Sequence, residues 1–197
     1  MPLWGITDES KPKWLTDSEK KESFANTSGW VIEGGSKMTG NGNANAQPEI
    51  LVAIRNLSNR MAEGTITEVE WITTAFSKSA AAASGRTLSV RVRYNEPVTV
   101  SGSPTLAVTN GNQGTGSGRG PHTLVYASGT GTNELVFSLA IAAANAATNA
   151  NDVLTVGAQT IALAGGTIKD TADGTTVSAR AISGAQGTAA GSITVVA

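Results

Sequence analysis

Hydrophobic and polar residues alternate along the second half of the chain. The segment 88–93 (LSVRVR) alternates strictly, which places its apolar side chains on one face of a half-buried strand. Glycine- and asparagine-rich turn signals separate several segments of the same kind. Seven or eight short strands spaced in this way predict an antiparallel β-sandwich. The further strands are predicted at 98–100, 105–109, 123–127, 134–141, 153–156, 160–163 and 192–196.

The apolar positions of these strands form the predicted core. Pro97 and Pro104 are expected at strand starts or edges, because proline has no N–H to give to a neighbouring strand. The predicted core consists of Leu88, Val90, Val92, Val98, Leu106, Val108, Leu124, Tyr126, Leu135, Phe137, Leu139, Leu154, Val156, Ile161, Leu163, Ile193 and Val195.

The first part of the chain has a less regular pattern. Thr16 followed by Glu19 three residues later has the spacing of a capping box, which predicts a short helix over 16–21. Apolar, β-branched segments at 50–55 and 69–74 predict strands. The segment 39–47 (TGNGNANAQ) has the composition of a loop. We therefore expect this region to be partly extended, with little helix.

Composition changes near residue 85. All four tryptophans and most of the charged residues lie before this point, and the small, glycine-ended segment 77–86 is typical of a linker. The sequence therefore predicts a mainly β protein of two parts, an N-terminal region at 1–84 and a β-sandwich at 85–197.

Charge and cysteine content exclude several classes of protein. The net charge is −1 and 15% of residues are charged, which argues against disorder and against nucleic-acid binding. There is no cysteine to form a disulfide or ligate a metal. The first twenty residues are polar, so we expect no signal peptide, and no apolar run is long enough to span a membrane. A chain made in a cytoplasm is expected.

Catalytic chemistry has little support in the sequence. His122 is the sole histidine, it follows Gly120-Pro121, and it is expected to be an exposed loop residue. One histidine without cysteine cannot build a zinc site. The glycine-rich segment 110–120 lacks the Lys-Ser/Thr of a phosphate-binding loop and is expected to be a flexible tip. We expect no enzyme, no catalytic residue, no metal and no cofactor.

Two carboxylate pairs leave alternatives open. Glu68 and Glu70 share one face of a predicted strand, where a solvated face is favoured over an acid/base pair. Asp170 and Asp173, followed by Gly174, fit an Asx turn better than a weak calcium loop.

The second part of the chain carries a family resemblance. The segments RVRYNEPVTVSGSPTLAVTNG, LVYASGTGTNELVFSLAI and NDVLTVGAQTIALAGGTIKDTADGTTV resemble Ig-like repeats of bacterial surface proteins and phage structural proteins over about 86–180. This resemblance implies an Ig-like sandwich and does not identify what the sandwich binds.

The opening segments resemble another group of proteins. MPLWGITDESKPKWLTD, GWV at 29–31 and PEILVAI at 48–54 are similar to the start of virion structural proteins of marine tailed phages, especially cyanophage-type myoviruses, although the asparagine-rich loop before Pro48 departs from their pattern. The resemblance implies a non-enzymatic virion structural protein, such as a capsid decoration or cement protein on the outer head surface. The alternatives are a tail, neck or fibre component, or an Ig-like adhesion module that binds host-surface glycans.

Tryptophans in the polar opening segment are candidate contacts with a partner, because tryptophan is enriched at binding hot spots. The alternative is that they fold back onto their own chain. The implied partners are the major capsid protein or other virion proteins, and a homo-oligomer is left open. The candidate partner-binding residues are Trp4, Trp14, Leu15, Trp30, Lys11 and Lys13.

Overall fold

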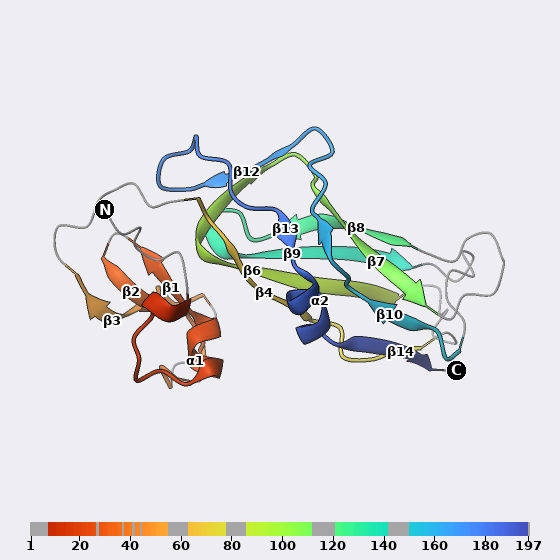
Figure 1. The fold of residues 1–197 in the computed structure, drawn as a ribbon, viewed down its shortest axis with the longest axis horizontal. Coiled ribbons are helices and arrows are strands. Elements are labelled where there is room, and N and C mark those ends of the chain that lie inside the picture. The colour runs from red at the N-terminus through yellow and green to blue at the C-terminus, as the bar shows by residue number, and fades with distance from the viewer. Residues whose placement is uncertain are drawn as a thin grey trace.

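The computed structural model describes residues 8–26, 28–36, 38–40, 42–43, 45–54, 63–77, 86–111, 121–141 and 150–196. It is mainly β with little helix, as expected from the sequence. A small N-terminal sheet with one short helix lies beside a large curled sheet (Figure 1). No helix in the described part of the chain is long and apolar enough to cross a membrane.

The N-terminal part is built around a three-stranded antiparallel sheet of order β1-β2-β3. Gly29 opens β2 with a φ of +130°, and a Cβ there would lie 2.0 Å from the carbonyl oxygen of Val52, so glycine is required for β2 and β3 to approach. The elements of this part are η1 (Asp8–Ser10), α1 (Asp17–Glu22), β1 (Ser23–Asn26), β2 (Gly29–Ile32) and β3 (Glu49–Ala53).

The capping box predicted from the sequence is confirmed at the start of α1. The Thr16 hydroxyl accepts a hydrogen bond from the Glu19 N–H at 3.3 Å, and a Glu19 carboxylate oxygen accepts one from the Thr16 N–H at 2.7 Å. These bonds satisfy two backbone donors that the first turn of a helix leaves without partners. The helix begins where the sequence indicated and directs the chain into β1.

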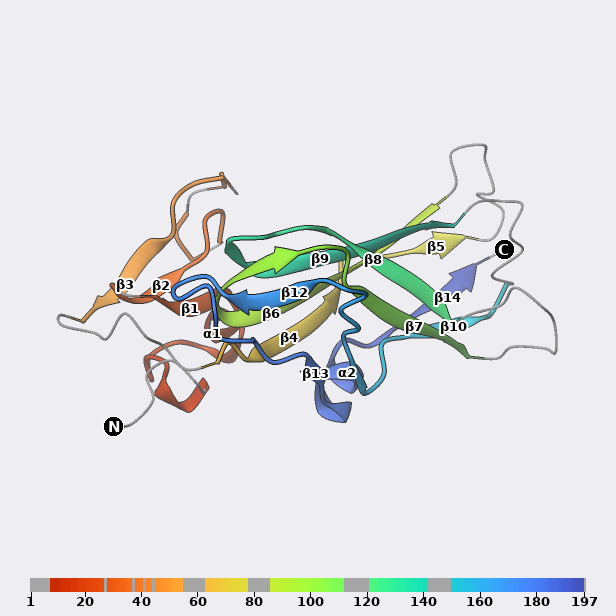
Figure 2. The same ribbon diagram turned by 90° about the horizontal axis from the view of Figure 1, so that it is seen from above.

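The large sheet has the order β12-β6-β9-β8-β7-β10-β14-β5, with β4 also paired to β6. Its pairings are antiparallel except that β5 runs parallel to β14. The sheet curls into a half-barrel (Figures 1 and 2). Its strands are β4 (Ile66–Trp71), β5 (Phe76–Ser77), β6 (Arg86–Ser101), β7 (Thr105–Gly111), β8 (His122–Ser128), β9 (Thr132–Ile141), β10 (Val153–Thr155), β12 (Thr167–Asp170) and β14 (Ser192–Val196).

A two-stranded sheet and a second helix complete the described fold. The strands β11 (Gln159–Thr160) and β13 (Ala181–Ile182) pair antiparallel. The helix α2 (Gly184–Ala189) precedes β14 and has a capping box of its own, from Ser183 and Gln186. β4 and β5 precede the boundary expected near residue 85, yet their backbones pair with β6 and β14, which follow it.

The long strand β6 pairs with three other strands of the large sheet, β4, β9 and β12. Its first part pairs with β4 on one side and β9 on the other, whereas Val98 to Ser101 pair with β12. The register with β9 shifts between Arg93 and Val98, and Pro97 lies in this interval. Pro97 was expected at a strand start or edge; it lies instead inside β6, where an irregular register tolerates the missing N–H. Pro104 immediately precedes β7, as expected.

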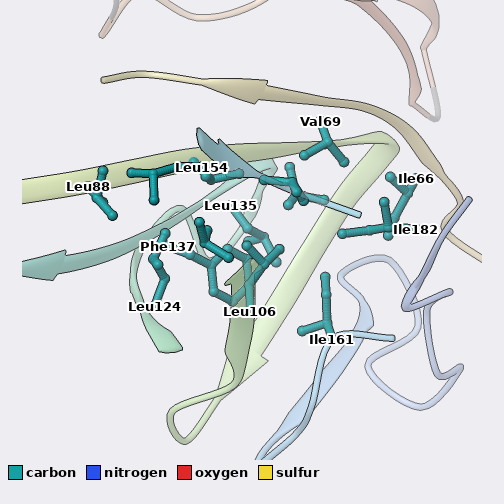
Figure 3. Close-up of a cluster of buried hydrophobic side chains, with 14 of the residues drawn as sticks. Ile66, Val69, Leu88, Leu106, Leu124, Leu135, Phe137, Leu154, Ile161 and Ile182 are labelled. Atoms are coloured by element: carbon teal, nitrogen blue, oxygen red, sulfur yellow. The ribbon is translucent and has the colours of Figure 1, made fainter. Parts of the chain in front are cut away.

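The core lies on the concave side of the large sheet. Figure 3 shows side chains from β6, β7, β8, β9 and β10 pointing toward one another, with Ile161 and Ile182 closing the cluster. Most of the predicted core is buried, whereas Tyr126, Leu139 and Leu163 are only partly buried and pack against it. The sequence analysis missed the buried Ile66, Val69, Phe76, Tyr94, Ile141, Ile168 and Ile182.

Candidate functional site

Two of the candidate partner-binding residues face outward. The Trp14 side chain is 61% exposed, and Lys13 beside it is also exposed. Trp4 lies outside the described residues. An exposed tryptophan has a large apolar area that is available to a partner.

Three other candidates are enclosed by their own chain. Leu15 and Trp30 are 4% and 2% exposed, and Lys11 is also buried. The Lys11 ammonium lies 5.9 Å from the centroid of the Trp30 ring and donates a hydrogen bond to the Lys20 carbonyl. This cation–π contact holds the segment before α1 against β2. In this conformation these three residues stabilise the N-terminal sheet.

The strand β3 is an edge of the N-terminal sheet. It pairs with β2 on one side, and within the described residues no strand pairs with its other side. Its side chains are exposed or half-buried, and Ile50 is 57% exposed. An unpaired edge with an exposed apolar side chain is a place where another chain can add a strand.

Charged side chains join the N-terminal sheet to the convex face of the large sheet. Strand register places Glu68 of β4, Arg93 of β6 and Glu134 of β9 in one row. The Arg93 Nη1 donates to a Glu68 oxygen at 2.7 Å, and its Nε donates to a Glu134 oxygen, also at 2.7 Å. One guanidinium therefore links three strands through two charge-assisted hydrogen bonds.

The neighbouring row and the N-terminal part add further ion pairs. Arg91 contacts Glu70 at 2.9 Å, directly across β4 and β6. From the N-terminal part, the Lys21 ammonium lies 2.8 Å from Glu68, and a Glu33 oxygen lies 3.4 Å from the Arg93 Nε. We call these seven residues the ion-pair network: Lys21, Glu33, Glu68, Glu70, Arg91, Arg93 and Glu134.

Glu68 and Glu70 therefore do not form a solvated face. The Glu68 side chain is only 12% exposed and that of Glu70 34% exposed, because Arg91 and Arg93 lie opposite them. Burial alone would raise the pKa of Glu68, but the hydrogen bonds from Lys21 and Arg93 outweigh it and lower the pKa. Both carboxylates are held in ion pairs and are not placed as an acid/base pair.

Glu33 is the carboxyl group of the network whose pKa is raised furthest from its ordinary value. Burial, followed by the nearby Glu134 carboxylate, raises the pKa of Glu33 to about 8, although Arg93 opposes this. The Asn133 side-chain amide also donates to Glu33, at 3.4 Å. Burial and the Glu134 carboxylate thus favour the protonated form of Glu33, whereas the Arg93 guanidinium favours its charged form.

A cleft of about 840 Å³ opens beside this network, between the N-terminal sheet and the end of β9. Its walls carry carboxylates, side-chain amides and guanidinium groups together with apolar surface that includes Phe24 and two prolines. The polar groups can exchange hydrogen bonds with the hydroxyls of a ligand, and the apolar surface can pack against its apolar parts. The polar lining includes Glu22, Asn26, Glu33, Asn45, Gln47, Arg91, Arg93, Asn133 and Glu134.

His122 is not the exposed loop residue that the sequence suggested. It is the first residue of β8, pairs with Val108 of β7, and is only 5% exposed. Burial lowers the pKa of His122, and the nearby Asp152 carboxylate partly opposes this. Asp152 also accepts a hydrogen bond from the Asn110 amide at 3.0 Å. The histidine therefore belongs to a small polar cluster at the end of the core.

The Asx turn expected after β12 is confirmed. One Asp173 oxygen accepts hydrogen bonds from the backbone N–H groups of Thr175 and Thr176, both at 2.7 Å. An Asp170 oxygen accepts one from the Ala172 N–H at 2.7 Å. Residues 112–120 of the predicted glycine-rich tip and residues 78–85 of the predicted linker lie outside the described residues. Asn110 and Gly111 belong to β7, Ser77 to β5 and Arg86 to β6, so the ends of both segments are strand.

In the described part of the chain, no three histidine or acidic side chains come together in an arrangement of metal ligands. No protein-family model matches the chain, and no curated protein or solved structure is significantly similar to it.

Proposed function

We propose that the large sheet is an Ig-like sandwich. Constant-type Ig domains have strands A, B, E and D in one sheet and C, F and G in the other. If β4, β6, β7, β8, β9, β10 and β14 are labelled A to G in chain order, the observed order β4-β6-β9-β8 is A-B-E-D, and β7-β10-β14 is C-F-G. The hairpin between β7 and β8 joins the two halves into one curled sheet. This agreement of strand order supports the family resemblance.

We further propose that the chain is a non-enzymatic virion structural protein that decorates or cements a phage head through its N-terminal part. The sequence resemblance of that part to virion proteins carries the proposal. The exposed surface of the same part supports it, because Trp14 and Ile50 have the largest exposed fractions among the large hydrophobic residues described. Large exposed apolar residues on a small unit are typical of a surface that becomes covered by a partner.

The proposed partner is the major capsid protein. The free edge of β3 offers backbone N–H and C=O groups to a strand of the capsid subunit, and Ile50 supplies apolar contact. The Ig-like part lies on the opposite side of the small sheet from β3 and would project away from the shell (Figure 2). An attachment repeated over many identical subunits gives a high copy number.

The test compares two matched variants of the full chain. Ile50→Lys and Val177→Lys each place a charge at an exposed apolar position, since these residues are 57% and 54% exposed. We expect Ile50→Lys to weaken binding to purified empty heads at least about tenfold, equivalent to about 1.4 kcal/mol, and Val177→Lys to bind like the unaltered chain. Equal binding by both variants would remove β3 from the interface. Failure of the unaltered chain to bind heads would refute the capsid assignment.

A second candidate function is binding of a host-surface glycan. The amide and carboxylate lining of the cleft beside the ion-pair network favours it, because such groups donate to and accept from sugar hydroxyls. Asn45 of the N-terminal part and Asn133 of β9 both line the cleft. Binding of the full chain to an array of bacterial surface glycans that is lost in Asn45→Ala would favour this function. No bound glycan, together with head binding, would favour the capsid role.

A further inference from the structure

Three buried oxygen atoms near the bend of β6 have no hydrogen-bond partner. They are the Oε1 of Glu96, the Oδ2 of Asp170 and the Oγ of Ser178. Each of the three residues is only 1% exposed. A buried polar oxygen without a partner is costly, and nearly all such atoms in proteins are satisfied. We call these three residues the buried oxygen cluster.

The fold brings the cluster together from three segments. Glu96 lies in β6 two residues before Val98, and Val98 is the pairing partner of Asp170 at the end of β12. The Ser178 N–H donates to the carbonyl of Ile168, which places this serine beside β12 as well.

Gly64 lies beside two of the three oxygens. A Cβ built on Gly64 would lie 3.0 Å from the Ser178 Oγ, 3.2 Å from the Val98 Cγ1 and 3.3 Å from the Glu96 Oε1. These two oxygens therefore point at the same small volume. A side chain at this position would occupy that volume.

In the part of the chain that the structure describes, no positive side chain forms an ion pair with either carboxylate. Neither Glu96 nor Asp170 takes part in any ion pair found among the described residues, where Arg91, Arg93 and Lys21 serve other carboxylates. The fold thus places two carboxyl groups and a hydroxyl together in a buried position.

We propose that the buried oxygen cluster binds a calcium ion. Carboxylates and a hydroxyl are hard oxygen ligands, which suit Ca²⁺ and do not suit the metals that prefer imidazole or thiolate. Two carboxylates match the charge of a divalent cation, and backbone carbonyls and water complete the six to eight ligands that Ca²⁺ takes. Ca²⁺ is preferred to Mg²⁺ because an irregular set of protein oxygens does not give the near-ideal octahedron that Mg²⁺ requires.

The bound ion would connect parts of the chain that are distant in sequence. Glu96 comes from the bend of β6, Asp170 from the end of β12, and Gly64 from the segment that enters β4. The ion would fix the bend of β6 and the Asx turn that follows β12. With only two carboxylates we expect an affinity in the range of extracellular calcium modules, a Kd of about 10⁻⁴ to 10⁻³ M.

The experiment uses the full chain, stripped of metal with EDTA and then titrated with CaCl₂ or MgCl₂. Isothermal titration calorimetry measures binding, and thermal unfolding measures stabilisation. At about one hundred times Kd, Ca²⁺ is expected to raise the melting temperature by about 5 to 10 °C. Mg²⁺ is expected to give a clearly smaller shift.

Four variants separate binding from a merely structural role. Glu96→Gln and Asp170→Asn keep the shape of the side chain and remove its charge, and Glu49→Gln and Asp17→Asn make the same changes at exposed positions. Because the charge is uncompensated without metal, we expect the two cluster variants to melt in EDTA at or above the temperature of the unaltered chain. They should gain nothing from Ca²⁺, while the two exposed variants keep the full shift.

Two results would overturn the proposal, and a third would contradict the reasoning behind it. One is the absence of both heat and stabilisation at about 10 mM CaCl₂, well above the expected Kd. The other is a Ca²⁺ shift of full size in both Glu96→Gln and Asp170→Asn, which would place the ion elsewhere. A cluster variant that melts lower than the unaltered chain in EDTA would show that the charged carboxylate already stabilises the metal-free fold, which also contradicts the reasoning.

Discussion

Replacing Arg93 with methionine tests the ion-pair network most sharply. The Arg93 side chain is only 9% exposed, and it donates hydrogen bonds of 2.7 Å to both Glu68 and Glu134. A hydrogen bond to a charged group contributes about 1.5 to 3 kcal/mol, so the two together contribute about 3 to 6 kcal/mol. Methionine fills much of the same space but leaves both carboxylates half-buried without this partner.

The expected loss lies at the lower end of that range. Lys21 still contacts Glu68 and Arg91 still contacts Glu134 after the change, and both contacts limit the cost. We therefore expect Arg93→Met to lower the free energy of unfolding by about 3 kcal/mol, near the loss seen when one partner of a buried ion pair is removed. Urea unfolding followed by tryptophan fluorescence measures this value.

Arg91→Met is the matched control, because Arg91 lies two residues away on the same face of β6. Its side chain is 29% exposed, so we expect a loss of about 1 kcal/mol or less. A double-mutant cycle of Arg93→Met with Glu68→Gln should show a coupling of at least about 1 kcal/mol. Equal losses for the two arginine variants, or no coupling to Glu68, would refute the claim that Arg93 is the centre of the network.

Three further predictions concern protonation and local geometry. Because the pKa of Glu33 is raised to about 8, its protonated form favours the folded state. The stability that it adds is full below its ordinary pKa of 4.5 and is lost as the pH rises through 8. Urea unfolding at about pH 5 and about pH 8 should therefore show a decrease in stability that is smaller in Glu33→Gln than in the unaltered chain. Thr16→Ala removes the capping box of α1 and should cost about 1 kcal/mol in the same assay, an expectation that an unchanged urea midpoint would contradict. Gly129→Ala should lower the stability of the fold strongly, because the new Cβ would lie 1.8 Å from the Glu134 carbonyl oxygen. A Cβ at Gly131 would have no atom within 4 Å, so Gly131→Ala should cost only the strain of its positive φ. Thermal unfolding compares the two variants.

Most strands of the large sheet were predictable because each has one buried face, whereas β5 and β12 were not predicted. The alternation at 88–93 gave the first half of β6 with the correct side inward. The sequence also contained a signal for α2 that the analysis did not use, since Ser183 and Gln186 have capping-box spacing. Two glycines within this six-residue helix hid it, because glycine is a poor helix former.

The ion-pair network was not predicted because it depends on strand register. Glu68 and Arg93 are 25 residues apart, and Glu134 is 41 residues beyond Arg93. A signal was present all the same: the acidic pair at 68 and 70 and the basic pair at 91 and 93 have the same spacing of two, so the two pairs can lie opposite each other on one face of two paired strands. The acidic pair, taken alone, had indicated a face exposed to solvent.

The burial of His122 and of the buried oxygen cluster could not be predicted from the local sequence. His122 follows a glycine and a proline, which suggested a loop, but pairing with Val108 turns it inward. The sequence analysis expected no metal site, and it examined Asp170 only together with its neighbour Asp173. The tertiary fold brings Glu96 and Ser178 to Asp170, and no spacing along the chain indicates that meeting.

Quantitative mass spectrometry of purified particles tests the central claim most directly. The proposal implies that a tailed phage encodes this chain. Particles of such a phage are purified, and the copy number of the chain is measured against that of the major capsid protein in the same sample. The account predicts a copy number of the same order as that of the capsid protein. Absence from the particles would contradict a virion role, and a copy number at the level of a tail or neck component would contradict attachment to the head.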